Sequence, residues 1–195
     1  MHGLINSAVQ SFFCSAYGGD RWRRVTAAAG LDFSEFEAML VYDDDLSMRV
    51  LAAACAESGR PQPELLEDLG TYLVCDPALE PLRRLLRFGG ASYPEFLHSL
   101  DDLPDRARLA VSDLHLPDME LRDHAEGSFT LTCRPGLPGF GSVMMGVLRA
   151  MADDYGALAT LDHGGVRDGC EVISISLIET AYAEGREFDL GARTG

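Results

Sequence analysis

The sequence predicts an α+β domain in which helices come first and a small antiparallel sheet follows. Apolar residues recur at helical spacing in the first part of the chain, and after Pro117 they alternate with polar residues as in strands. The 195 residues, 47% of them hydrophobic, are enough for one compact unit with a buried core. We therefore expect one domain over residues 1–190, with a helical lobe at about 1–60, an α/β lobe at about 61–190 and a tail at 191–195.

The helices are predicted from apolar stripes and from the residues that interrupt them. The first stripe begins at Leu4 and ends near Phe13, and Gly18-Gly19 breaks it. Ser92 and Glu95 form a capping box ahead of a further helical segment. The other helices are expected at residues 21–29, 34–39, 44–57, 63–73, 77–88 and 143–155.

The strands are predicted from alternation and from turn residues. Residues 119–123 and 128–133 are expected to form a hairpin, because Phe129, Leu131 and Cys133 alternate with polar residues. Residues 158–162 and 171–177 are expected to pair across a turn at Gly164-Gly165. The second hairpin contains the clearest strand pattern in the chain.

The bulk composition argues against several classes of partner. The formal net charge is -15, from 31 acidic and 16 basic residues, and this opposes binding to nucleic acid or to anionic membranes. The sequence contains no apolar run near the length of about 20 residues that spans a bilayer, and its start lacks the pattern of a signal peptide. Five scattered cysteines fit reduced thiols, so we expect a cytoplasmic protein.

One motif carries a family resemblance. Residues 96–106 read Phe-Leu-His-Ser-Leu-Asp-Asp-Leu-Pro-Asp-Arg, which resembles the ligand helix of the H-NOX family of haem-dependent nitric oxide and oxygen sensors. The opening Met-x-Gly-x-Ile-Asn, the Tyr42-Asp43-Asp44 stretch and Gly89-Gly90 also resemble the family, so the similarity extends over essentially the whole chain. The resemblance implies the H-NOX fold and a haem cofactor. Position 104, however, matches the histidine that binds the iron, and Pro104 has no side-chain nitrogen to replace it.

The same resemblance implies four residues of a haem pocket. Pro117 matches a proline that presses on the porphyrin, and Ile5 matches an apolar pocket residue. The family's Tyr-x-Ser-x-Arg clamp for the haem propionates corresponds to Thr130, Thr132 and Arg134. Arg134 keeps the guanidinium that can bind a carboxylate through two hydrogen bonds, and Thr132 keeps a hydroxyl. A surface charge at the end of a strand remains an equal interpretation of Arg134, and ordinary helix packing remains one for Ile5.

A few other side chains are candidates to replace the missing iron ligand. His98 lies six residues before position 104, so on a helix it points about 120° away. His115 lies close to Pro117 and reaches a cofactor only if the local path of the chain differs from that of the family. Met144 and Met145 are the candidates on the opposite side, although methionines at helical spacing usually pack in a core. Because residues 138–146 contain no tyrosine, the resemblance implies binding of nitric oxide over oxygen.

Proline at position 104 also affects the helix itself. A proline in a helix interior costs roughly 3 kcal/mol, so Leu103-Pro104-Asp105 predicts the start of a new helix.

The function expected from the resemblance is regulatory and not enzymatic. We expect an H-NOX-like domain with altered or lost haem ligation that acts on a signalling enzyme in trans, either a histidine kinase or a cyclic-di-GMP enzyme. The alternatives are a cofactor-free interaction module on the same scaffold, or a domain that binds another tetrapyrrole or an apolar ligand. The sequence contains no set of residues at a spacing typical of a catalytic site. Asp43-Asp44-Asp45 is interpreted as a helix-cap cluster in preference to a cation site.

Overall fold

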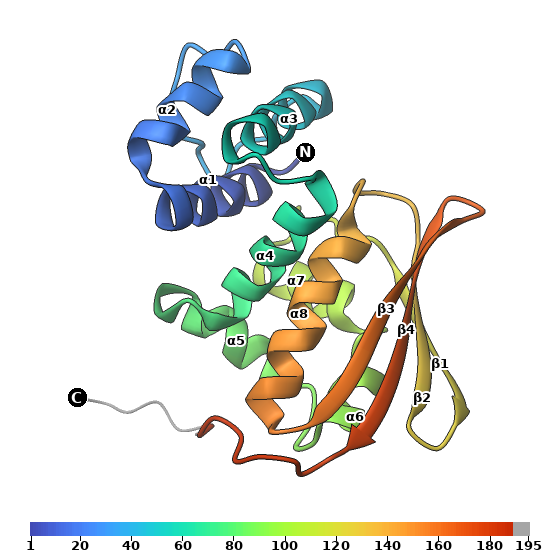
Figure 1. Ribbon diagram of the computed structural model, residues 1–195. Coiled ribbons are helices and arrows are strands. Elements are labelled where there is room, and N and C mark those ends of the chain that lie inside the picture. The colour runs from blue at the N-terminus through green and yellow to red at the C-terminus, as the bar shows by residue number, and fades with distance from the viewer. Residues whose placement is uncertain (189–195) are drawn as a thin grey trace.

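A computed structural model describes residues 1–188 and shows helices gathered beside a four-stranded sheet (Figure 1). The first helices are α1 (Gly3–Tyr17), α2 (Gly19–Ala28) and α3 (Asp44–Ser58). The later ones are α4 (Gln62–Cys75), the short 3-10 helix η1 (Pro77–Leu79), α5 (Glu80–Arg87), α6 (Tyr93–His98), α7 (Leu103–Ala110) and α8 (Phe140–Tyr155). The strands are β1 (Met119–Ala125), β2 (Ser128–Cys133), β3 (Leu158–Arg167) and β4 (Cys170–Glu179).

The sheet has the order β1-β2-β4-β3, and all neighbouring strands are antiparallel. In Figure 1, α8 lies along the sheet, and α4 runs beside α8 on the side away from the strands. The α+β fold class is therefore confirmed. The division into lobes near residue 60 stays a prediction, and the tail at 191–195 lies outside the described residues.

Two groups of buried side chains hold these layers together. One group joins α6 and α8 to the sheet and includes Phe96, Leu131 and Leu148. The other joins α1, α2, α3 and α4 and includes Phe13 and Trp22. Burial of this much apolar surface is the main favourable contribution to folding.

Helices α4 and α8 touch through glycines. A Cβ atom added at Gly70 would lie 2.0 Å from the carbonyl oxygen of Val143, and one at Gly146 would lie 2.0 Å from that of Glu67. Any side chain at either position would therefore force the two helices apart. The close approach requires glycine on both helices.

The helix predicted at residues 34–39 is wrong, because this segment is irregular in the structure. Side chains from elsewhere use its backbone groups: the indole of Trp22 donates to the Ser34 carbonyl at 2.7 Å, and the Phe36 amide donates to Gln10 at 2.8 Å. The rings of Phe36 and Tyr42 also meet edge to face, with 4.9 Å between their centroids. Tertiary contacts thus replace the bonds that a helix would make.

The turn predicted at Gly164-Gly165 is also wrong. Those glycines lie within β3, where the register with β4 is irregular, and the chain reverses at Asp168-Gly169. Both turn residues have positive φ, 52° for Asp168 and 79° for Gly169. This geometry favours an Asp-Gly pair in a tight hairpin, so the second hairpin is longer than predicted.

The predicted helix start at Leu103-Pro104 is confirmed, since α7 begins at Leu103 with the proline in its first turn. Leu103 and Pro104 are buried, and Asp105 occupies the first turn, where a negative charge is favourable. The guanidinium of Arg106 donates to the Ser99 carbonyl at 2.9 Å and so fixes α7 to the end of α6. None of the helices within residues 1–188 has both the length and the apolar character needed to cross a membrane.

Candidate functional site

The start of the chain and two loops of the α/β part border a partly open cavity of about 1050 Å³. Its walls include Met1, His2 and Ile5 at the beginning of α1, the segment 113–118 before β1, and the segment 134–137 after β2. Apolar side chains from each of these segments line it beside charged and imidazole groups. A hollow of this volume has room for a large organic ligand, one side of which would face solvent.

Three of the four residues predicted from the family resemblance lie in this cavity. Ile5, Pro117 and Arg134 all line it, although they are far apart in the sequence. Thr132 does not line it: this residue lies inside β2, where it pairs with Glu120 on one side and Val172 on the other. That the four residues bind a cofactor stays a prediction.

Arg134 is positioned by its backbone at the end of β2. Its amide donates to the carbonyl of Asp118 at 2.8 Å, so the two loops that line the cavity are joined at this point. The side chain is 59% exposed, and its Nη2 lies 3.8 Å from a carboxylate oxygen of Glu120. Hydrogen bonding to Arg122 and the charges of Arg122 and Arg134 lower the pKa of Glu120, so this carboxylate is an anionic partner for Arg134.

His2 is a buried histidine that serves as a helix cap. Its Nδ1 accepts a hydrogen bond from the Leu4 amide at 3.1 Å at the start of α1. A neutral imidazole that accepts at Nδ1 carries its proton on Nε2, and this atom lies 3.3 Å from a carboxylate oxygen of Asp113. Neither nitrogen then has a lone pair available for a metal ion.

His115 lies in the same cavity with the opposite arrangement of its ring nitrogens. Its Nδ1 lies 2.9 Å from the carbonyl oxygen of Asp113, and a carbonyl oxygen only accepts, so Nδ1 carries the proton and donates. Within residues 1–188, the structure shows no hydrogen bond to its Nε2. His115 is one of the candidate replacement ligands named from the sequence, and it lines the cavity together with Pro117.

The remaining candidates for an iron ligand lie outside the cavity. His98 on α6 has its Nε2 3.5 Å from a carboxylate oxygen of Asp123. Met144 and Met145 are buried in the core between α8 and the sheet. Pro104 is buried as well and is not part of the cavity wall, whereas Arg108, one turn later on α7, is.

The residues of this cavity fit a haem group in their chemistry. Ile5, Pro117 and Leu137 offer apolar contact to a macrocycle, Arg134 offers a cation for a carboxylate, and His115 offers an imidazole nitrogen. These groups come from three separate segments of the chain, and the fold brings the segments together.

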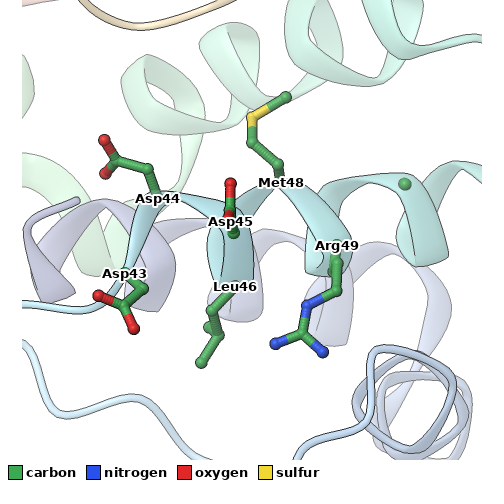
Figure 2. Close-up of a pocket in the computed structure, with 7 residues that line it drawn as sticks. Asp43, Asp44, Asp45, Leu46, Met48 and Arg49 are labelled. Atoms are coloured by element: carbon green, nitrogen blue, oxygen red, sulfur yellow. The ribbon is translucent and has the colours of Figure 1, made fainter.

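A second hollow, of about 900 Å³, lies at the start of α3 (Figure 2). Asp43 is the residue before the helix, and Asp44 and Asp45 occupy its first turn. The N-terminal ammonium of Met1 contacts Asp44 at 2.5 Å, and Arg49 donates to the carbonyl of Ala29 at 2.9 Å. The carboxylates in the first turn suit the positive end of the helix, although the Asp43 side chain caps no backbone amide. Within residues 1–188 the site offers nothing further that points to a cation.

Comparison with known proteins gives the family context of this cavity. A sequence model of the Haem-NO-binding family matches residues 2–163. The chain is 25% identical over 154 residues to the soluble guanylate cyclase gcy-31 of Caenorhabditis elegans. This alignment covers 79% of this chain and 22% of that protein. It is 22% identical over 155 residues to the soluble guanylate cyclase 89Db of Drosophila melanogaster, with 80% of this chain and 23% of that protein covered. The chain thus spans less than a quarter of the length of these relatives.

Solved structures share the fold at lower sequence identity. The Fe(II) unliganded H-NOX protein of K. algicida superposes with a TM-score of 0.79 at 14% identity, over 94% of this chain and 100% of that one. An oxygen-binding H-NOX domain related to soluble guanylate cyclases gives a TM-score of 0.68 at 15% identity, over 96% and 100% of the two chains. These matches show that the arrangement of helices and sheet is that of H-NOX proteins.

Proposed function

Because the chain belongs to the Haem-NO-binding family, we propose that it is a regulatory sensor domain whose haem ligation differs from that of the family. The observation that carries this proposal is the cavity between α1 and the loops around β1 and β2. It keeps Ile5, Pro117 and Arg134 together, while the family's ligand position is a buried proline outside the cavity wall. A site that retains the contacts for a macrocycle and moves or loses its iron ligand explains both facts.

The residues of the chain have separate tasks in this proposal. Arg134 binds a carboxylate of the cofactor, in exchange for its contact with Glu120. Ile5, Pro117 and Leu137 pack against its apolar faces and exclude water. Haem, when bound, would supply an iron atom able to bind a diatomic gas such as nitric oxide.

The signal is proposed to reach a partner enzyme in trans, either a histidine kinase or a cyclic-di-GMP enzyme. The relatives named above are guanylate cyclases that are several times longer than this chain, and this supports a link between the domain and signalling enzymes. Helix α7 carries both Pro104, at the family's ligand position, and Arg108, on the cavity wall. A change in the cavity is therefore able to reach the surface through this helix.

The test is the visible spectrum of the purified protein after expression with haem supplied. We expect a Soret band that shifts when nitric oxide is added, and a change in the activity of a partner kinase or cyclic-di-GMP enzyme from the same host. The Arg134→Ala variant should bind haem more weakly. Absence of a Soret band, together with no change on titration with haem, would overturn the sensor proposal.

The second candidate is a cofactor-free interaction module. Two observations favour it: Pro104 has no ligating atom, and a carboxylate of Glu120 already lies near Arg134. If this candidate is correct, the domain changes the activity of its partner to the same extent with and without nitric oxide. The same enzyme measurement therefore separates the two candidates.

A further inference from the structure

We propose that His115 is the iron ligand of this domain and replaces the histidine that position 104 lacks. The inference rests on the proposed function, because it assigns a residue to the same cavity. It places the ligand on the loop between α7 and β1 and not on α7 itself. Three observations support it. The imidazole of His115 lines the cavity, its Nδ1 donates a hydrogen bond so that Nε2 is unprotonated, and each of the other histidines either lies outside the cavity or has no available nitrogen.

The hydrogen bond of His115 leaves the correct nitrogen for a metal ion. Histidines that bind metals almost always donate their second ring N–H to a carbonyl or a carboxylate, which fixes the tautomer and the ring orientation. Nδ1 of His115 donates in this way to the Asp113 carbonyl at 2.9 Å. The lone pair of Nε2 is then free to coordinate iron.

The other four histidines of the sequence do not meet these conditions. His2 lines the cavity, but its Nδ1 accepts from the Leu4 amide, so its Nε2 is protonated. His98 lies outside the cavity.

The remaining two are engaged elsewhere in the sheet. Nε2 of His124 lies 2.8 Å from the hydroxyl of Thr130, on the first hairpin. His163 accepts from the Gly165 amide at Nδ1 and contacts Glu171 at 3.2 Å through Nε2. His115 is therefore the histidine that combines a place on the cavity wall with an available nitrogen.

The loop that carries His115 is held on both sides of the ring. Leu114 and Pro117 are buried, so the backbone is anchored just before and just after the imidazole. The carboxylate of Asp113, on the same loop, lies 3.3 Å from Nε2 of His2 at the start of α1. The imidazole itself is exposed and lines the same cavity as Ile5 and Arg134. A ligand on such a fixed loop has its orientation set before the cofactor binds.

The experiment compares haem binding by the wild type, His115→Ala and the matched control His98→Ala. Both changes remove an exposed imidazole, and only His115 lies in the cavity. We expect His115→Ala to weaken haem binding by more than about tenfold, since loss of outer-shell partners alone costs about 10–100-fold in metal affinity. Imidazole added to the buffer should restore the spectrum of the wild type, and thermal unfolding of the apo variants checks that both fold.

The readouts distinguish the possible outcomes. Resonance Raman spectra of the ferrous wild type should contain an iron–imidazole stretch that is absent from His115→Ala and returns with free imidazole. If His115→Ala keeps the wild-type haem affinity and that stretch, the ligand assignment is wrong while the sensor proposal stands. If the folded wild type takes up no haem, both the assignment and the cofactor-bearing function are overturned.

Discussion

Single residues decide the haem chemistry that we propose for this domain. Pro104 removes the donor from the family's ligand position, and His115 offers one in the adjoining loop. The sequence alone identifies the first fact, because a pyrrolidine ring has no free nitrogen lone pair in any fold. It offers His115 only as one of several candidates, because the tautomer of an imidazole depends on which atoms surround its two nitrogens.

Asp154, the most buried charged residue within residues 1–188, provides a test of stability. The carboxylate of Asp154 has 0% exposure, and Nε of Arg83 lies 2.7 Å from it. The side chains of Arg87 and Arg186 contact the same carboxylate at 3.4 Å and 3.7 Å. Replacing Asp154 with alanine leaves the buried Arg83 without its main partner, so we expect the free energy of unfolding to fall by about 3–5 kcal/mol. Urea denaturation measures this loss.

The control for this prediction is an exposed pair. Asp20 contacts Arg23 one turn away on α2, and its side chain is 82% exposed. Because water screens such pairs, Asp20→Ala should change the free energy of unfolding by less than about 1 kcal/mol. Equal losses for the two variants would show that the Asp154 cluster contributes no more than a surface ion pair.

Among the helices and strands, periodic segments are predicted well, and segments whose backbone bonds go to distant partners are predicted poorly. The α8 region, the first hairpin and the capped start of α6 follow from local patterns, and the Ser92 hydroxyl does accept from the Glu95 amide. The pairing of the second hairpin also follows from its strand pattern, but the position of its turn does not. Residues 34–39 fail because Trp22 and Gln10 bind their backbone. No local pattern contains those partners.

The contact between α4 and α8 is a second feature whose importance only the structure shows. We expect Gly146→Ala to destabilise the protein by about 1–3 kcal/mol or more, because its Cβ would lie 2.0 Å from the carbonyl of Glu67 and the helices would have to separate. Thermal unfolding gives the change. Gly19→Ala is the matched control: Gly19 begins α2, a Cβ there meets no atom within 4 Å, and the same added methyl group should be neutral or slightly stabilising. A neutral Gly146→Ala would mean that the two helices do not touch at this point.

For the domain as a whole, the acidic composition and the buried tyrosines set the response to alkaline pH. Burial raises the pKa of Tyr155 to about 12 from an ordinary value of 10.0, and burial also raises the pKa of Tyr93. The folded state therefore holds these protons more tightly than the unfolded chain does. The stability from this source is complete below pH 10 and is lost as the pH rises toward about 12. Further negative charge on a chain of net charge -15 adds to the loss.

This pH dependence is tested with Tyr155→Phe. The variant loses the hydrogen bond from the Tyr155 hydroxyl to the Gly90 carbonyl, 2.8 Å long, so it starts about 1 kcal/mol less stable at neutral pH. Between pH 10 and about 12, however, its free energy of unfolding should fall less steeply than that of the wild type. Tyr182→Phe, which changes a tyrosine with 62% exposure, should follow the wild-type slope. Parallel curves for all three proteins would contradict the prediction.

Local patterns in the chain are sufficient for the α+β class, most of the helices and strands, the new helix at Leu103 and the lack of an iron ligand at position 104. These properties depend on periodicity, on caps and on the covalent structure of proline. Only the folded chain shows that Ile5, Pro117 and Arg134 share one cavity, that Thr132 does not belong to it, and that His115 enters it with Nε2 available. The shared cavity depends on contacts between segments far apart in the chain. The tautomer of His115 depends on the backbone path that brings the Asp113 carbonyl to its Nδ1, and no periodic pattern of residue types predicts that path.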